Sequence, residues 1–292
     1  MKKTFLIIVA AALLLQGSLA FAYDLPDLDA MELDELLELQ AAVDDAVQAK
    51  KMQSLEDGEY AEATRSNPAL IAQPAIVEGD NYSVKYKSIF TVQHVLRGNA
   101  AGVVASSFNK YNARTLEKGT EWILVHIYIE AMESDSEKID FNSYNFRFVN
   151  SKGVEVNTEY LADNPSEVSP LYVGSSQLAW LAVKAIPGEN YFLTFSEYDS
   201  DSIWFDLNHR AIVDTSSITF EPIDKQSADK STIIDLQLRL LELGYLKTAP
   251  TGKYDSNTSA AVKKVQKALS LKQTGVADND VLRAIMSGAS IP

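Results

Sequence analysis

The sequence predicts a multidomain protein of mixed β and α structure, in which a β-sandwich is followed by a small module of three helices. Two patterns carry this prediction: short stretches of alternating apolar and polar residues over positions 75–222, and apolar residues at helical spacing over positions 231–290. A hydrophobic content of 46% in 292 residues supplies enough apolar side chains for the cores of about two domains.

The first residues have the features of a secretory signal peptide. Two lysines precede the apolar run Phe5–Leu15, and Ala20-Phe21-Ala22 has the small-x-small pattern of a cleavage site. We therefore expect cleavage between Ala22 and Tyr23, which removes residues 1–22 and leaves a secreted chain without membrane contact. An uncleaved membrane anchor is the alternative, but the apolar run is too short to span a bilayer.

An amphipathic helix is expected within residues 23–53, because Leu33, Leu36 and Leu37 share one face and acidic residues fill the first turns. Its apolar stripe breaks before it forms heptads, so docking on the next domain is favoured over pairing with another helix. Residues 54–74 are polar and contain two prolines, which predicts a linker.

Residues 75–222 contain short strands separated by turn residues. The clearest strand is Trp122–Glu130, in which isoleucine and valine occupy every second position from Ile123 to Ile129. Turns are indicated at Asn150–Gly153 and at Pro187-Gly188. A series of about seven or more such strands is typical of a β-sandwich.

Four stretches of this region carry a family resemblance: Gly119–Glu130, Ile139–Phe141, Phe146–Gly153 and Ala179–Pro187. They resemble the telokin-like, immunoglobulin-fold domains of secreted and surface proteins of Gram-positive bacteria. The resemblance implies an immunoglobulin-like sandwich and a Gram-positive source, and it implies no chemistry. Glu130-Ala131-Met132 departs from the Asn-containing turn that is usual in that family.

Three helices are expected in residues 231–290, after a second linker at 223–230. The first begins at Ser231 or Thr232 and ends at Gly244, the second begins at Asp255 or Ser256, and the third follows Asp278. Three short helices of this kind enclose one small apolar core.

The same segment matches a known pattern over its whole length. The matching residues are Leu236-Gln237, Leu243-Gly244-Tyr245, Gly252–Asp255, Thr258–Gln266 and Thr274–Asp278. The segment resembles the peptidoglycan-binding domain that is found on many cell-wall hydrolases. It departs from the family pattern at Val265, where the family has Phe, and at Ser270, where it has Gly.

This second resemblance implies peptidoglycan as the partner and the cell wall as the location. It indicates six candidate contacts, namely Tyr245, Tyr254, Asp255, Thr258, Lys263 and Gln266. Tyrosine rings can pack on sugar rings or stem peptides, and lysines can pair with stem carboxylates. The alternative is that the tyrosines belong to the core and that the lysines form only a solvated helix face.

Charge is unevenly distributed along the chain. The formal net charge is −14, and residues 230–288 hold nine basic and five acidic residues, which makes that segment +4 and residues 23–229 −20. Residues 23–229 would repel a phosphate backbone because of this negative charge, which argues against nucleic acid as a partner. The basic segment is instead expected to meet an anionic wall surface.

Composition and spacing argue against most catalytic classes. The chain has no cysteine, which excludes disulfides, thiolate zinc ligands and a cysteine nucleophile. Its three histidines are far apart in the sequence, so neither a metal site nor a cofactor is predicted. Ser227 and Lys230 have the spacing of some serine nucleophiles but lie in an expected linker. A glycosidase-like carboxylate pair stays open, although we expect no catalytic residue.

Three functions therefore stay under consideration. The favoured one is a secreted, non-catalytic protein that binds peptidoglycan through its C-terminal module and presents the sandwich to another envelope protein. The second is a peptidoglycan hydrolase, or a hydrolase accessory, with an unrecognised catalytic site. The third is a passive spacer of the envelope.

Overall fold

The computed structural model describes residues 60–81, 84–197, 202–226, 229–289 and 291. The expected signal peptide and the expected helix within residues 23–53 lie outside the described residues. The sandwich and the C-terminal helices belong to one compact unit, Ala61–Asp214 together with Phe220–Pro292. Of the other unit, the structure describes Tyr60 and Thr215–Thr219.

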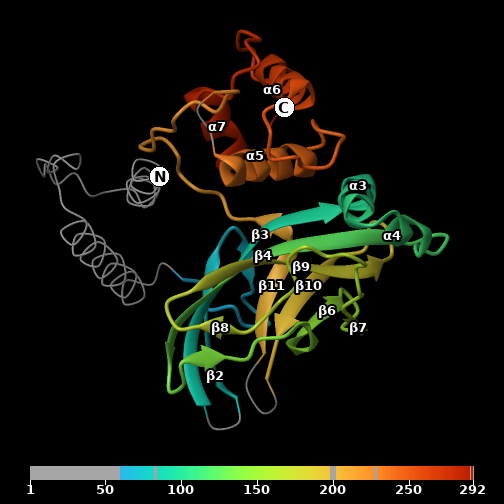
Figure 1. Ribbon diagram of the computed structural model, residues 1–292, viewed down its shortest axis with the longest axis vertical. Coiled ribbons are helices and arrows are strands. Elements are labelled where there is room, and N and C mark those ends of the chain that lie inside the picture. Colours follow the sequence, from blue (N-terminus) through green and yellow to red (C-terminus); the bar gives the residue numbers. More distant parts are fainter. Residues whose placement is uncertain (1–59, 82–83, 198–201, 227–228, 290, 292) are drawn as a thin grey trace, which may run out of the picture. The chain divides into compact units, whose positions relative to one another are not determined.

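Two β-sheets form the middle of the chain, and the β-sandwich prediction is confirmed (Figure 1). The first sheet is antiparallel, with the order β2 (Pro74–Asn81), β3 (Val84–Arg97), β4 (Glu121–Ser134) and β9 (Ser176–Ala185). The second has the order β1 (Ala69–Ile71), β11 (Ile203–Arg210), β10 (Tyr191–Phe195), β6 (Phe146–Asn150) and β7 (Glu155–Asn157). A small additional pair joins β5 (Lys138–Ile139) to β8 (Leu171–Tyr172).

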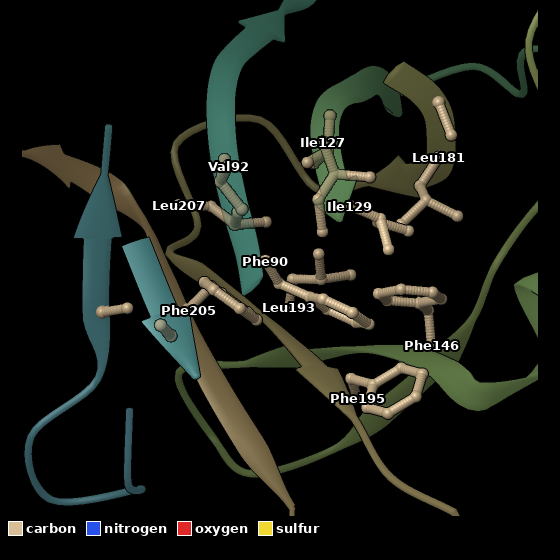
Figure 2. Packing of buried hydrophobic residues seen from close by; sticks show 14 of the residues in the cluster. Phe90, Val92, Ile127, Ile129, Phe146, Leu181, Leu193, Phe195, Phe205 and Leu207 are labelled. Atoms are coloured by element: carbon tan, nitrogen blue, oxygen red, sulfur yellow. The ribbon is translucent and has the colours of Figure 1, made fainter. Parts of the chain in front are cut away.

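The core of the sandwich lies between the two sheets. Figure 2 shows Phe90, Val92 and Ile127 of the first sheet among Phe146, Leu193, Phe195 and Phe205 of the second. The rings of Phe90 and Phe195 meet edge to face with their centroids 4.8 Å apart. The predicted strand Trp122–Glu130 is present, extends to Ser134, and buries its isoleucines and valine in this core as the alternation predicted.

The structure corrects the sequence predictions for the sandwich and for the segment that precedes it. β1 lies inside the predicted linker 54–74 and pairs in parallel with β11. Two helices, α3 (Gly98–Phe108) and α4 (Lys110–Arg114), interrupt the predicted run of strands. Two glycines and two serines in α3 lower its intrinsic helix propensity, so it is stabilised mainly by burying Ala101, Val104 and Ala105.

Part of the face of the first sheet that points away from the sandwich core is also buried. Trp122 and Leu124 of β4 and Trp180 of β9 lie in a second hydrophobic cluster, which includes the buried face of α3. The same cluster continues into the core of the C-terminal helices through Leu236 and Leu240. The outer face of the sheet is therefore covered around Trp122, Leu124 and Trp180, and the helical module packs on the sheet through this cluster.

Three helices make up the module, as predicted: α5 (Lys230–Glu242), α6 (Ser256–Ala268) and α7 (Asn279–Met286). Each is capped by an aspartate, and Asp229, Asp255 and Asp278 accept a hydrogen bond from the backbone N–H three residues later. Of the two predicted starts of the second helix, the structure shows Asp255 as the cap, and the third helix follows Asp278 as predicted. The predicted cap of the first helix is wrong, because Asp229 occupies the position assigned to Ser231 or Thr232.

The predicted linker at 223–230 takes part in the module. Ile223 and Ala277 exchange backbone hydrogen bonds with N···O distances of 2.9 and 3.1 Å. No helix in the described ranges is long and apolar enough to cross a membrane.

Candidate functional site

Two buried glutamines hold the two glycine loops of the helical module. Gln237 of α5 accepts hydrogen bonds from the N–H groups of Thr251 and Gly252 at 2.8 and 3.0 Å, and its amide donates to Lys253 O at 3.0 Å. One side chain thus satisfies three backbone groups of the first loop. Such a loop needs no ligand or water at these positions to hold its shape.

The second loop is held in the same way from α6. Gln266 accepts from Gly275 N at 2.9 Å and donates to Val276 O at 3.0 Å and to Thr274 Oγ1 at 2.8 Å. Gly275 has a positive φ of 74°, and a Cβ there would lie 2.3 Å from Ser259 Oγ. The loop therefore requires glycine both for its backbone conformation and for space.

Three of the six predicted contact residues are interior. Tyr254, Thr258 and Gln266 are buried, and the Tyr254 hydroxyl donates to Gly275 O at 2.8 Å. Burial raises the pKa of Tyr254 to about 12. These residues join the two loops and the start of α6, so their visible role is to shape the module. Their contact with peptidoglycan stays a prediction.

The other three predicted contacts reach the surface. Asp255 is partly exposed and fixes the start of α6 through Thr258. Tyr245 is half-buried after Gly244, and Lys263 is exposed, with its stem across Gly275. Three of the six predicted contact residues are therefore buried inside the module, and three are accessible at its surface.

The accessible residues continue into a basic face on α6. Lys263, Lys264 and Lys267 are all exposed at helical spacing, and Lys272 follows in the loop. Apolar residues on the opposite side of the helix, Val262 and Val265, are fully buried. The cationic face is the part of the module that is suited to an anionic polymer.

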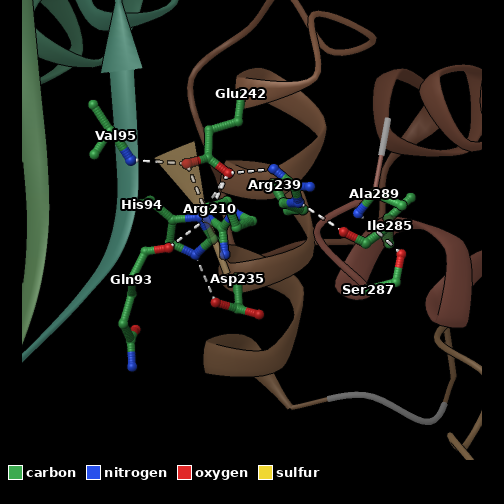
Figure 3. Close-up of polar contacts among 10 residues, drawn as sticks. All are labelled: Gln93, His94, Val95, Arg210, Asp235, Arg239, Glu242, Ile285, Ser287 and Ala289. Atoms are coloured by element: carbon green, nitrogen blue, oxygen red, sulfur yellow. Dashed lines mark hydrogen bonds and ion pairs between the residues drawn. The ribbon is translucent and has the colours of Figure 1, made fainter. Parts of the chain in front are cut away.

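A buried polar cluster, absent from the sequence predictions, ties this module to the sheet (Figure 3). At its centre is Glu242, near the end of α5. Its carboxylate accepts from Val95 N at 2.8 Å, from Arg210 Nη2 at 2.8 Å and from Arg239 Nη1 at 2.9 Å. Strand β3, strand β11 and helix α5 therefore meet at one carboxylate.

His94 of β3 completes the cluster. Its Nε2 lies 2.8 Å from Asp235 Oδ1 and its Nδ1 3.4 Å from Glu242 Oε2. Because both ring nitrogens face carboxylates, the imidazole is protonated and donates from each. Burial by itself lowers the pKa of His94, but the hydrogen bonds to Asp235 and Glu242 outweigh it and raise the pKa to about 9.

The neighbouring histidine, His126, is neutral, whereas His94 is protonated. His126 lies across from His94 in the β3–β4 register, with ring centroids 6.1 Å apart, and stacks on Trp180 at 4.3 Å. Burial, and then the charge of His94, lower the pKa of His126 to about 3. Within the described residues, no three His, Asp or Glu side chains are grouped so that they could hold a metal ion.

The sequence carried one signal for this cluster. Asp235, Arg239 and Glu242 follow one another at intervals of four and three residues, which places three charges along one face of α5. Such a face is usually solvated. Its partner, His94, lies 141 positions from Asp235, and sequence spacing cannot predict that approach.

Comparisons with known proteins agree with the module assignment. Residues 229–285 match the family model described as "Putative peptidoglycan binding domain". This family therefore accounts for the C-terminal module, and the resemblance predicted for that segment is confirmed. A comparison with curated proteins gave no match.

Several solved structures are similar to the sandwich at low identity. The secreted protein MPT63 from Mycobacterium tuberculosis has a TM-score of 0.33 and 9% identity, over 45% of this chain and 92% of that one. The yjhA protein from Bacillus subtilis has a TM-score of 0.32 and 13% identity, over 48% and 99%. An uncharacterized β-sandwich protein from Clostridium difficile has a TM-score of 0.29 and 10% identity, over 47% and 93%. At these values the similarities carry no argument about function.

Proposed function

We propose that this chain is an exported, non-catalytic protein of the cell wall that binds peptidoglycan through residues 229–285. The observation that carries the proposal is the family match of this segment. The aspartate-capped helices and the glutamine-held loops supply a rigid surface, and the exposed lysines of α6 supply positive charge. In this proposal the sandwich stays packed against the module and presents its exposed surfaces to another envelope protein.

The charge distribution supports an oriented attachment. Residues 230–288 are +4 and residues 23–229 are −20, so an anionic wall polymer attracts one part of the chain and repels the other. Because attraction of this kind is screened by salt, binding is expected to weaken as ionic strength rises.

Co-sedimentation of the full chain with purified sacculi tests the proposal. We expect the chain to pellet with the sacculi, and we expect the triple variant Lys263→Glu, Lys264→Glu, Lys267→Glu to bind about tenfold or more weakly, because it changes the module from +4 to −2. The matched control reverses three exposed lysines of the sandwich region, Lys118, Lys138 and Lys152. Both variants have the same net charge, so a loss that is specific to α6 identifies the module as the binding surface.

Two results would contradict the proposal. A wild-type chain that stays in the supernatant overturns the assignment of wall binding. Release of soluble muropeptides by the purified chain overturns the non-catalytic assignment and favours a hydrolase.

A further inference from the structure

A polar hollow lies on the sandwich, away from the helical module. It has a volume of about 650 Å³, within the range of small-molecule sites. The side chains that line it come from the outward side of the second sheet and from the segment that leads into β6, and they include Asp140, Tyr144, Asn145, Arg147, Glu155, Thr194 and Trp204. The proposed role of the module in wall binding does not use this hollow.

Its floor is a cross-strand row of three residues. Thr194 of β10 pairs with Arg147 of β6 on one side and with Trp204 of β11 on the other. Residues that pair in this way project to the same face of a sheet, about 5 Å apart. Regular strands therefore fix the spacing of a guanidinium, a hydroxyl and an indole.

The row and its neighbours have unused hydrogen-bonding capacity. Arg147 uses Nη1 for the backbone oxygens of Tyr144 and Phe146, and in the described part of the chain its Nε and Nη2 have no partner. Asn145 donates to Ser196 O at 3.3 Å, whereas its buried Oδ1 accepts no bond from any described residue. The half-free guanidinium of Arg147 is therefore a donor that a polar ligand in the hollow can satisfy, whereas the Asn145 oxygen is closed off from solvent.

Two aromatic side chains accompany these polar groups. The indole of Trp204 forms a T-shaped pair with Phe192, with centroids 6.2 Å apart, and the guanidinium of Arg65 lies over it at 5.4 Å from the ring centroid. Tyr144 is 80% exposed, so its ring is accessible to a ligand in the hollow. Aromatic groups of this kind offer flat apolar faces beside polar tips.

We propose that this hollow binds an oligosaccharide. A sugar ring combines apolar faces with closely spaced hydroxyl groups that both donate and accept, which suits aromatic rings beside Arg147, Thr194 and Glu155. The carboxylates of Asp140 and Glu155 disfavour an anionic ligand, and the polar floor disfavours a lipid. The chain would thereby contact glycan at a second place, separate from the lysines of α6.

Tryptophan fluorescence of the full chain tests the proposal with three probes, namely chitotetraose, cellotetraose and maltotetraose. Trp122 and Trp180 are buried, so a ligand in the hollow acts mainly on Trp204. We expect saturable quenching with at least one probe. Tyr144→Ala and Glu155→Gln, both changes of exposed side chains, should each raise the Kd about fivefold or more, and the matched Tyr172→Ala should leave it unchanged.

Absence of saturable binding with all three probes overturns the proposal. It is equally overturned if a probe binds and neither Tyr144→Ala nor Glu155→Gln changes its Kd. Sacculus binding through the lysines of α6 is measured separately, so the hollow can fail this test while the module still binds the wall.

Discussion

His94 Nε2 lies 2.8 Å from Asp235 Oδ1, and this contact joins β3, an inner strand of the first sheet, to the first helix of the peptidoglycan-binding module. The pair is backed by Glu242, which reaches the backbone of the same strand at Val95 N. A hydrophobic cluster that the sheet and the module share joins the same two parts. The two parts are therefore expected to unfold together, as one cooperative unit.

Replacement of Glu242 should show how much the polar cluster contributes to the free energy of unfolding. In Glu242→Gln, the charges of His94, Arg210 and Arg239 lose their common partner while they stay buried. Removal of one member of a buried ion pair costs about 3–5 kcal/mol, so we expect a loss of about 3 kcal/mol in the free energy of unfolding, measured in urea. The control is Glu117→Gln at an exposed position, which should change stability by less than about 0.5 kcal/mol. Equal effects at the two sites would show that the cluster contributes nothing specific.

Stability should decrease between pH 6.5 and 9. The pKa of His94 is raised in the folded state from 6.5 to about 9, so its contribution is fully present below pH 6.5 and is lost as the pH rises through 9. Urea midpoints measured from pH 6 to 10 should fall in the wild type and should fall less in His94→Gln, which has no titrating group there. Parallel curves for the two proteins would contradict the charged state assigned to His94.

At acid pH the protein should lose stability as the pH falls, because of Glu242. Burial by itself raises the pKa of Glu242, but His94 and the two arginines outweigh it and lower the pKa from 4.5 to about 2. Its contribution is therefore present above pH 4.5 and is lost as the pH falls through 2. Acid unfolding of Glu242→Gln, followed by circular dichroism, should be less steep over this interval than that of the wild type. A slope equal to that of the wild type would rule out Glu242 as the titrating group.

The local patterns of the chain could be predicted because each has a local cause. Aspartates before α6 and α7 mark helix starts through a bond that spans three residues, and the alternation in Trp122–Glu130 marks a strand with one face in the core. Helix α3 could not be predicted, since its glycines and serines give little helical signal until the sheet covers its alanine face.

The contacts between distant segments depended on the tertiary fold. Trp122 and Leu124 alternate with the residues of the sandwich core, and only the helices that pack on this side of the sheet explain why they are also buried. Likewise, Glu242 and His94 are 148 positions apart, and no spacing rule connects them. Among the six candidate contacts, sequence could identify the motif positions but could not separate the buried Thr258 from the exposed Lys263.

Gly275 should tolerate no side chain. Its φ is positive, and a Cβ would approach Ser259 Oγ to 2.3 Å, so Gly275→Ala is expected to destabilise the protein by about 2 kcal/mol or more. Gly119 is the matched control, because it has a φ of 88° with no atom within 4 Å of the added Cβ. Gly119→Ala should therefore cost only the conformational part, about 1 kcal/mol. Thermal unfolding measures both, and equal losses would show that the contact with Ser259 has no effect.

Ser270 adopts a left-handed backbone conformation, and it stands where the pattern that this segment resembles has glycine. It follows α6 with a φ of 58°, in the left-handed region, where a side chain other than glycine is strained. We expect Ser270→Gly to stabilise the protein by about 0.5–1 kcal/mol, since the relieved strain exceeds the added flexibility of the unfolded chain. Ser287, at the end of α7, has a φ of −62°, so Ser287→Gly should instead destabilise. If both substitutions shift the unfolding temperature in the same direction, backbone conformation does not explain the Ser270 effect.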